Sequence, residues 1–588
     1  MKSFAALFLG LAVWLQGQEP VLTPDSLVQP GVPRGTLTWH TLAPGNFYPG
    51  TPHRYAVYRP ARLPVGQAAS YMIFLDGTGA IQGMHVPVVL DNLIARGDLP
   101  PLVGIFVDPG ILPVLSPEQQ NRYERIFEYD SLSDRFVSFL LEELVPAVAQ
   151  EQLLSDRADD HAIAGVSTGA VGAFVAAWQR PNQFHRLLSL IGTYVDMKGA
   201  EELPSLVRKT EPRPLRVFMQ DGRNDHIVPG QPWGISFAGS WPINNQVMFE
   251  ALKFAGYDAR LVMGEGLHNT RQGAVLMPEA LRWLWGGYPR PIAVREPATM
   301  TQPGYEPRGR VYSLVSADRP WEQIGGTYSS IGGLAANAEG ELFFTEPLAS
   351  RLYRVDVGGR VSLVRDDVGG AAALGFGPAG RLYAAQPLAH RIVSFGPAGE
   401  MRVEAERVEA ATLTVTARGE VYFLDRLTGG IGRISPRGGL RRGQKPPEMI
   451  LPSGLALSPD QGLLVVADGQ SRFSWSYQLG PDRTPENGEP FYRLYVPDLA
   501  PASGVTAVTL DTLGQVFFAS PLGIQVAEQN GRIAAILNGP DFGRVSSLAF
   551  GGQGQSWLYA VQAHKLFRRK TKVTGAGATP VKPPQPAL

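Results

Sequence analysis

The stretch Asp160-His-Ala-Ile-Ala-Gly-Val-Ser-Thr-Gly-Ala170 decides how the first half of the chain folds. A short apolar run ends at Ala164, Gly165-Val-Ser-Thr-Gly169 follows it, and Ala170 to Trp178 is rich in small residues that suit a helix. This order predicts a strand, a sharp turn and a helix, with Ser167 at the turn. In a G-x-S-x-G turn the glycines leave space where side chains would clash, so the serine hydroxyl projects above the sheet. Ser167 is therefore the candidate nucleophile.

Strands and helices alternate around this turn. Continuous apolar runs predict strands that are buried on both faces, and longer amphipathic stretches between them predict helices. The expected strands are 37–42, 54–58, 71–75, 102–107, 162–166, 187–191, 216–220 and 259–263, and the expected helices include 88–96, 133–150, 170–178 and 277–285. This βα order predicts a mostly parallel sheet with helices on both faces. Ligands of such sheets bind beyond the carboxyl ends of the strands, where Ser167 is expected.

A serine hydroxyl needs a base to accept its proton and a carboxylate to orient that base. His268 is the favoured base because it follows the strand 259–263, whereas His185 suits a surface turn and His226 suits either a loop or a pocket wall. Asp225 follows the strand 216–220 and is the favoured acid. Asp221 is the alternative, although at a strand end its side chain is suited to holding the loop by hydrogen bonds.

Negative charge on a reacting carbonyl oxygen requires preformed hydrogen-bond donors. We expect these from the backbone N–H of Thr168 and from the loop that contains Gly77 and Thr78. Asp76 precedes that loop and either fixes it or contacts substrate. Trp233 and Trp241 lie in an aromatic, Gly- and Pro-rich segment, and they either stack on a sugar ring or aromatic acyl group or pack within the loop.

Several longer stretches resemble a known family. They are FYPGTPHRYAVYRP, FLDGTG, FEYDSLSD, AIAGVSTGA, RVFMQDGRND, GSWPINNQ, GEGLHN and PEALRWLWGGYP. From about residue 31 to 291 the chain resembles the bacterial esterase family related to enterochelin esterase and to feruloyl and acetylxylan esterases. The resemblance implies an α/β-hydrolase sandwich with Ser167 as nucleophile, Asp225 as acid and His268 as base. Ala170 and the stretch GLHNTRQGA depart from the family pattern, which bears on substrate specificity more than on the reaction.

The second half of the chain is repetitive. Strand-like stretches recur from Gly340, Gly380, Gly419, Gly462, Gly514 and Gly554, at intervals of 39 to 52 residues. A repeat near 40 residues made of short strands is typical of a β-propeller, and six copies predict six blades.

This half resembles the gluconolactonase and regucalcin family, notably in SGLALSPDQGLLVVAD and LGIQV. The resemblance implies a divalent metal held at the propeller axis by Glu, Asn and Asp side chains. The corresponding residues here carry no carboxylate; they are Gly332-Gly333-Leu334, Ala411-Thr412-Leu413 and Thr506-Ala507, with Ala372 and Ser453 at further pocket positions. We therefore expect a propeller without a metal, kept for binding or for packing.

Composition narrows the remaining choices. The 588 residues exceed one core, the formal net charge is zero, and there is no cysteine, so nucleic-acid binding, disulfides and thiol chemistry are not expected. The apolar run Phe4 to Leu15 predicts a signal peptide and is too short for a membrane span. The expected organisation is a signal peptide 1–17, an N-terminal extension 18–35, an esterase domain 36–290, a linker 291–311, a propeller 312–570 and a disordered tail 571–588.

These expectations converge on a periplasmic or secreted serine carboxylic-ester hydrolase that needs no cofactor and acts on a small-molecule or carbohydrate ester of the feruloyl or acetyl type. One alternative is a metal-dependent lactonase in the propeller. Another is a carbohydrate-binding protein without turnover. The oligomeric state is left open by the sequence.

Overall fold

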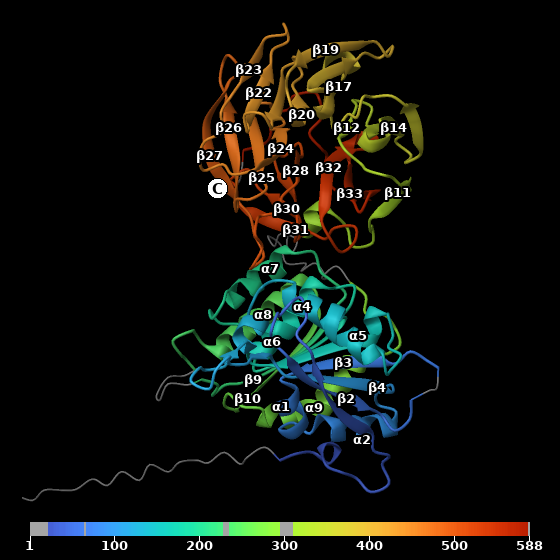
Figure 1. Ribbon diagram of the computed structural model, residues 1–588, viewed down its shortest axis with the longest axis vertical. Coiled ribbons are helices and arrows are strands. Elements are labelled where there is room, and N and C mark those ends of the chain that lie inside the picture. Colours follow the sequence, from blue (N-terminus) through green and yellow to red (C-terminus); the bar gives the residue numbers. More distant parts are fainter. Residues whose placement is uncertain (1–20, 64–65, 227–233, 295–309, 586–588) are drawn as a thin grey trace, which may run out of the picture.

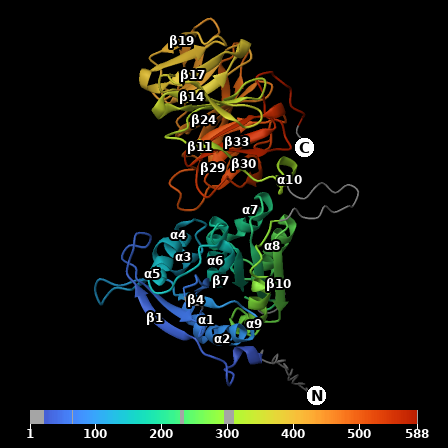
Figure 2. The same ribbon diagram turned by 90° about the vertical axis from the view of Figure 1, so that its right-hand side faces the viewer.

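The computed structural model describes residues 21–63, 66–226, 234–294 and 310–585. They form two units stacked along the long axis of the molecule, an α/β unit from the first half of the chain and a β-propeller from the second (Figures 1 and 2). The predicted fold class is therefore confirmed. The predicted signal peptide and most of the predicted linker lie outside the described residues.

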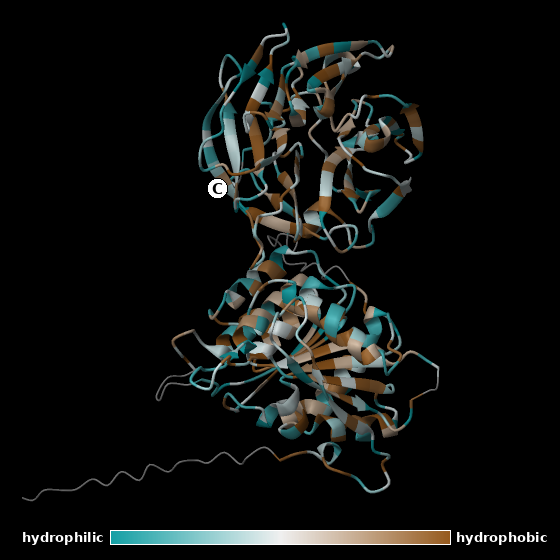
Figure 3. Ribbon diagram, viewed as in Figure 1, coloured by the Kyte–Doolittle hydropathy of each residue, from teal (hydrophilic) through white to brown (hydrophobic). Residues whose placement is uncertain are grey.

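Among the described residues, the main sheet of the α/β unit has eight strands in the order β1-β2-β4-β3-β7-β8-β9-β10. They are β1 (Thr36–Leu42), β2 (His53–Arg59), β3 (Ser70–Leu75), β4 (Leu102–Val107), β7 (His161–Val166), β8 (Arg186–Leu190), β9 (Arg216–Gly222) and β10 (Asp258–Gly264), beside a small ribbon of β5 (Ile111–Leu112) and β6 (Arg122–Tyr123). The strands from β4 to β10 in this order are mutually parallel, and β1 and β2 add an antiparallel edge. The central strands are strongly hydrophobic (Figure 3), and all carboxyl ends of the parallel strands meet at one edge.

Helices cover both faces of this sheet. Leu93 of α2 and Leu281 of α9 belong to the apolar cluster on one face, and Phe174 of α6 and Met248 of α8 belong to the cluster on the other. The helices of this unit are α1 (Gly77–Gln82), α2 (Val86–Arg96), α3 (Arg125–Tyr129), α4 (Arg135–Phe139), α5 (Val145–Ala149), α6 (Thr168–Gln179), α7 (Leu203–Lys209), α8 (Trp241–Ala255) and α9 (Arg271–Trp285). None of the described helices is long and apolar enough to span a bilayer.

The described part of the second half forms six four-stranded antiparallel sheets, one for each predicted repeat. The first three blades are β12 (Leu334–Ala336), β13 (Leu342–Glu346), β14 (Arg351–Val355) and β15 (Val361–Arg365); β16 (Ala373–Phe376), β17 (Leu382–Gln386), β18 (Arg391–Phe395) and β19 (Met401–Glu406); and β20 (Ala410–Val415), β21 (Val421–Asp425), β22 (Gly430–Ile434) and β23 (Leu440–Arg442). The next two are β24 (Pro452–Leu457), β25 (Leu463–Asp468), β26 (Phe473–Leu479) and β27 (Pro485–Arg493); and β28 (Ala507–Leu510), β29 (Val516–Ser520), β30 (Gly523–Ala527) and β31 (Ile533–Leu537).

The sixth blade closes the ring. It consists of β32 (Val545–Gly551), β33 (Trp557–Gln562), β34 (Lys565–Lys570) and β11 (Glu322–Thr327). Strand β11 precedes all the others of the propeller in sequence and pairs antiparallel with β34, which follows them all. The first and last strands of the propeller therefore hold each other, and a short helix, α10 (Val311–Leu314), packs against β31 of the preceding blade.

The segment after β34 is not the free tail that its composition predicted. Gly575 N–H donates to Gln555 O at 2.8 Å, Ala576 N–H donates to Leu510 O at 2.9 Å, and residues 576–578 line one end of the channel between the innermost strands. Backbone groups make these bonds, so a Gly- and Ala-rich sequence can form them without a distinctive side-chain pattern. Up to residue 585 the chain therefore lies on the propeller surface.

The two units share a buried contact. Strand β31, the outermost of its blade, lies against α7, and Glu211 N–H donates to Ile536 O at 2.8 Å. The Arg569 guanidinium binds the Glu211 carboxylate with bonds of 2.8 and 2.6 Å, and the two side chains are only 4% and 10% exposed. Trp178 and Leu206 of the α/β unit belong to the same apolar cluster as Leu494 of the propeller. The propeller is therefore docked through its rim.

Candidate active site

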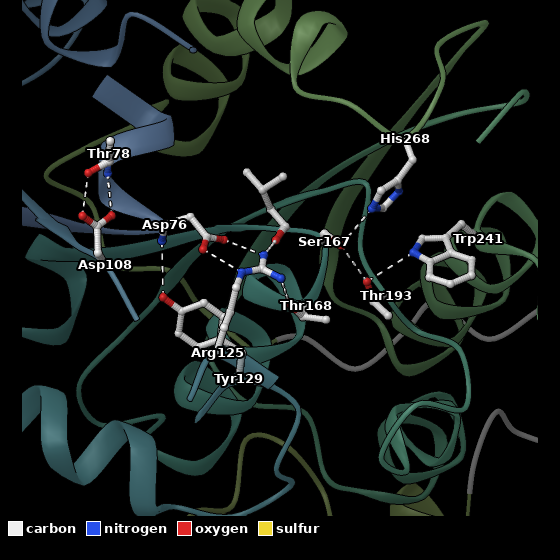
Figure 4. Close-up of polar contacts among 11 residues, drawn as sticks. Asp76, Thr78, Asp108, Arg125, Tyr129, Ser167, Thr168, Thr193, Trp241 and His268 are labelled. Atoms are coloured by element: carbon white, nitrogen blue, oxygen red, sulfur yellow. Dashed lines mark hydrogen bonds and ion pairs between the residues drawn. The ribbon is translucent and has the colours of Figure 1, made fainter. Parts of the chain in front are cut away.

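Ser167 occupies a strained turn between β7 and α6. Its φ and ψ angles are 58° and −122°, a conformation that side-chain-bearing residues rarely adopt. A Cβ atom on Gly165 would lie 1.9 Å from Gly169 O, and one on Gly169 would lie 2.9 Å from Asp76 Oδ2. Backbone packing thus requires glycine at Gly165, and a side chain at Gly169 would displace the Asp76 carboxylate. The turn presents the Ser167 hydroxyl at the carboxyl edge of the sheet, as the spacing predicted (Figure 4).

The structure brings the three principal candidates together. Ser167 Oγ lies 2.9 Å from His268 Nε2, and His268 Nδ1 lies 2.9 and 2.8 Å from the two carboxylate oxygens of Asp225. Asp225 lies in the loop after β9, and His268 lies in the loop after β10. The Asp225 side chain is fully buried, whereas His268 is 20% exposed. The three side chains form one continuous hydrogen-bonded chain that ends at the solvent-accessible side.

Asp221, the alternative acid, lies behind Asp225 rather than against His268. Its carboxyl group is hydrogen-bonded to that of Asp225, and it also accepts from Gly222 N–H at 2.7 Å and from Asn245 Nδ2 at 2.9 Å. Burial, reinforced by the neighbouring Asp225, raises the pKa of Asp221 to about 9. Asp221 is therefore protonated at neutral pH and donates to Asp225, which leaves Asp225 as the carboxylate that faces the base.

The surroundings of His268, the candidate base, also shift its pKa. Burial lowers the pKa of His268, and the positive charge of Arg125 adds to this effect. Burial raises the pKa of Asp225 to about 6 while its hydrogen bond with Asp221 opposes the rise. Above that pH the ionised Asp225 accepts from His268 Nδ1–H, so Nε2 is the unprotonated nitrogen that faces Ser167.

One of the predicted oxyanion donors is not available. Thr78 N–H donates to Asp108 Oδ1 at 2.7 Å, and its hydroxyl donates to Asp108 Oδ2 at 2.5 Å, because both groups face that carboxylate across the first turn of α1. The backbone N–H groups of Thr168 and Gly77 donate to no acceptor among the described residues. These two donors stay open to a ligand, and the prediction for Thr78 is wrong.

Sequence reasoning missed Arg125. Its guanidinium donates to both Asp76 carboxylate oxygens, at 2.8 and 2.7 Å, to Val166 O at 3.1 Å, and to the Thr168 hydroxyl. Asp76 is therefore engaged in fixing the loop beside the turn, and it is not a free substrate ligand. The partners lie 41 to 49 residues from Arg125 in sequence, and no local pattern signals such a contact.

The aromatic candidates have different outcomes. Trp241 is only 4% exposed, and its ring packs 4.3 Å from His226 and 5.7 Å from His268, so it is not the exposed stacking surface that its sequence context suggested. Trp233 lies outside the described residues. The His226 ring centroid lies 4.1 Å from that of His268 with the rings tilted by 34°, and burial together with the charge of His268 lowers the pKa of His226. Loop packing explains Trp241, while His226 forms part of the wall beside the base.

The propeller positions that correspond to metal ligands do not fit a divalent cation. The Thr506 hydroxyl donates to Val545 O at 2.7 Å, and a Cβ atom on Gly333 would lie 2.4 Å from Leu374 N. Nearby acids are used elsewhere: Glu346 accepts from Ser329 N–H and Asp468 accepts from Ile450 N–H. Among all described residues, the one group of three potential ligands is Asp225, His226 and His268, which belongs to the site beside Ser167.

The fold and this site define a chain with an α/β-hydrolase-like unit and a β-propeller. Residues 48–284 match the family model described as "Putative esterase", and residues 416–564 match that of the "SMP-30/Gluconolactonase/LRE-like region". The first half of the chain thus matches an esterase-family model and the second half a gluconolactonase-like one, which confirms the predicted resemblance. These matches support the prediction of a carboxylic ester hydrolase.

Several individual proteins are similar to parts of the chain. A gluconolactonase of Zymomonas mobilis is 26% identical over 233 residues, which are 35% of this chain and 64% of that protein. An iron(III) enterobactin esterase of Escherichia coli K12 is 32% identical over 193 residues, which are 32% of this chain and 45% of that protein. A crystal structure of the enterobactin esterase from Shigella flexneri is 21% identical with a TM-score of 0.34 and covers 45% of this chain and 64% of that one. The chain spans less than two thirds of each of these relatives.

Proposed function

We propose that the protein is a serine carboxylic-ester hydrolase in which Ser167, His268 and Asp225 act as nucleophile, base and acid. The observation that carries the proposal is the chain of contacts from Ser167 Oγ to His268 Nε2 and from His268 Nδ1 to Asp225. Each residue occupies the loop at a strand end that its role requires, in the chain order serine, acid, histidine.

The geometry supports a two-step reaction. His268 Nε2 takes the proton as Ser167 Oγ attacks the ester carbonyl, and the resulting oxyanion is bound by the N–H groups of Thr168 and Gly77. His268 then protonates the leaving alcohol, which leaves an acyl group on Ser167. A water molecule, deprotonated by His268, releases the acid and restores the serine. Asp225 holds the imidazole in the tautomer that both steps require.

We further propose an ester of a carbohydrate or plant-derived acid, of the feruloyl or acetyl type, as the substrate, and a periplasmic or secreted location. The Arg125 charge beside the turn is matched by Asp76, so the described residues offer little to attract a highly anionic ester. A panel of acetyl, feruloyl and enterobactin esters would rank the substrate classes. Cell fractionation with an antibody would locate the protein, and an exclusively cytoplasmic signal would overturn the proposed export.

The propeller is proposed to support the esterase domain by packing, without turnover of its own. Asp498 of the propeller accepts from Leu132 N–H at 3.1 Å and donates its own N–H to Leu132 O at 3.3 Å. Leu132 follows α3, which carries Arg125, so this reciprocal pair fixes one side of the site. Lactone opening is not proposed, because the residues at the axis do not suit a divalent cation.

The direct test is hydrolysis of 4-nitrophenyl acetate by the full chain and by Ser167→Ala. The variant should lose the reaction, and the wild type should become covalently labelled by a fluorophosphonate on Ser167. Ser205→Ala, which removes an exposed serine of α7, is the matched control and should retain full activity. Undiminished hydrolysis by Ser167→Ala would refute the assignment.

A further inference from the structure

A second hydroxyl group contacts the nucleophile. Thr193 lies in the loop after β8, and its Oγ1 is 3.0 Å from Ser167 Oγ (Figure 4). The same oxygen lies 3.2 Å from Trp241 Nε1. Thr193 is fully buried, and its N–H donates to Ser167 O at 3.2 Å. Both the backbone and the side chain of Thr193 are thus bound to the turn that carries the nucleophile.

Only one assignment of donors and acceptors is consistent with all hydrogen bonds of this network. An indole N–H can only donate, so Thr193 Oγ1 accepts from Trp241. His268 Nδ1–H faces Asp225, which leaves Nε2 as the acceptor for the single proton of Ser167. The contact between the two hydroxyls must then have Thr193 as donor and Ser167 Oγ as acceptor. Trp241 therefore donates to Thr193, Thr193 donates to Ser167, and Ser167 donates to His268.

Helix α8 holds this network in place. Asn244 Nδ2 donates to Tyr194 O at 2.7 Å, and Asn245 Nδ2 donates to Gly192 O at 2.7 Å, so the residues on both sides of Thr193 are tied to the first turns of α8. Trp241, the first residue of that helix, adds the bond to the Thr193 side chain. Three residues of one helix thus fix three consecutive positions of the loop, which is more than is needed to close a turn.

We propose that Thr193 is a further catalytic residue of this site and that Trp241 is the residue that positions it, an inference that rests on the proposed esterase function. As His268 removes the Ser167 proton, negative charge builds on Oγ while the bond to the carbonyl carbon forms. The Thr193 hydroxyl donates to that oxygen and keeps its own proton throughout. The same bond stabilises Oγ when it leaves the carbonyl carbon during deacylation.

The test compares Thr193→Val, which replaces the hydroxyl by a methyl group, with Thr193→Ser, which retains the hydroxyl. Removing one donor from an oxyanion hole costs about 100- to 1,000-fold in kcat. Thr193 donates to the nucleophile oxygen, which carries only part of the developing charge, so kcat/KM of Thr193→Val for 4-nitrophenyl acetate should fall by a smaller factor, about 10- to 100-fold, through kcat. KM should change by less than about threefold, and Thr193→Ser should stay within about threefold of wild type. Thr193→Ala provides the same comparison if valine is not accommodated.

The positioning role is tested with Trp241→Phe, which keeps the ring and removes the N–H. Its kcat should fall by less than that of Thr193→Val, and the double variant should be no slower than Thr193→Val, since Trp241 acts through Thr193. Multiplicative losses in the double variant would overturn the role of Trp241. Equal losses in Thr193→Val and Thr193→Ser, or a loss below twofold in Thr193→Val, would overturn the role of the hydroxyl.

The outcome is separable from that of the proposed function. An inactive Ser167→Ala together with an unaffected Thr193→Val would leave the esterase assignment in place and refute this inference alone. An active Ser167→Ala would refute both. Thermal unfolding of every variant identifies losses of kcat that follow from loss of the fold.

Discussion

Replacing Arg569 with methionine should destabilise the whole chain, chiefly by leaving Glu211 unpaired; it also removes the donors to Arg319 O and Ser316 O. In the folded protein the Glu211 carboxylate accepts two bonds from Arg569 and one from Asn538 N–H at 3.0 Å. Methionine fills similar volume but leaves the carboxylate buried with a single neutral donor. Removing one partner of a buried ion pair costs about 3–5 kcal/mol, because the remaining charge is uncompensated. We expect a loss in that range for Arg569→Met.

Two further variants make this magnitude interpretable. Arg360 forms a surface pair with Asp356 and its side chain is 86% exposed, so Arg360→Gln should change the free energy of unfolding little. Adding Glu211→Gln to Arg569→Met removes the unpaired charge and should recover at least half of the loss.

The assay is urea unfolding followed in parallel by tryptophan fluorescence and by residual ester hydrolysis. In the wild type we expect the two curves to coincide because the units share one buried interface, whereas two independently unfolding domains would give separate curves. In Arg569→Met they should separate and shift to lower urea. The reasoning would be refuted if Arg569→Met lay within about 0.5 kcal/mol of Arg360→Gln.

Three other predictions follow from the site. Because the pKa of Asp221 is raised to about 9 in the folded protein, its contribution to stability is complete below its unfolded pKa near 3.8 and is lost as pH rises through about 9. In that window the free energy of unfolding of the wild type should fall by up to about 1.4 kcal/mol per pH unit, and that of Asp221→Asn should not. The variant should also retain activity. Urea unfolding at several pH values measures both slopes, and identical slopes would contradict this prediction. Since the pKa of His268 is lowered, the acidic limb of kcat/KM on a neutral ester should have its midpoint below pH 6.5, and a midpoint above 7 would contradict it. Gly165→Ala should yield little folded protein, because its Cβ would lie 1.9 Å from Gly169 O, and soluble expression with normal circular dichroism would count against that packing.

The parts that could be predicted from the sequence are those set by local chemistry. The turn at Ser167 was predictable because such turns need small residues beside the serine, and at Gly165 backbone atoms leave space for glycine alone. The strand ends were predictable because buried parallel strands are continuous apolar runs. The number of blades followed from the repeat, in which Gly340, Gly380, Gly419 and Gly514 all have φ between +70° and +89° at the same turn. Asp225 and His268 follow from strand order, and their catalytic role stays a prediction.

Features that depend on distant contacts could not be predicted. Thr193 lies 26 residues from Ser167 and 48 from Trp241, and neither separation has a periodic signature. Trp241 was interpreted either as a stacking surface or as a residue packed within its loop, and the placement of α8, which buries its ring, decides for packing. The Thr78 N–H was unavailable because Asp108, from the end of a neighbouring strand, binds it.

The pairing of β11 with β34 also determines when the propeller can close during synthesis. About 240 residues separate these strands, and bringing the ends of such a segment together costs roughly 5 kcal/mol of chain entropy, which the completed blade must offset. During synthesis β11 therefore stays unpaired until β34, the last strand of the propeller, has left the ribosome. Arg569 belongs to that same last strand. The ring therefore closes, and Glu211 of the earlier-synthesised esterase domain is neutralised, in the same late step. A nascent chain that stops before residue 565 has neither the closed ring nor the Glu211–Arg569 pair.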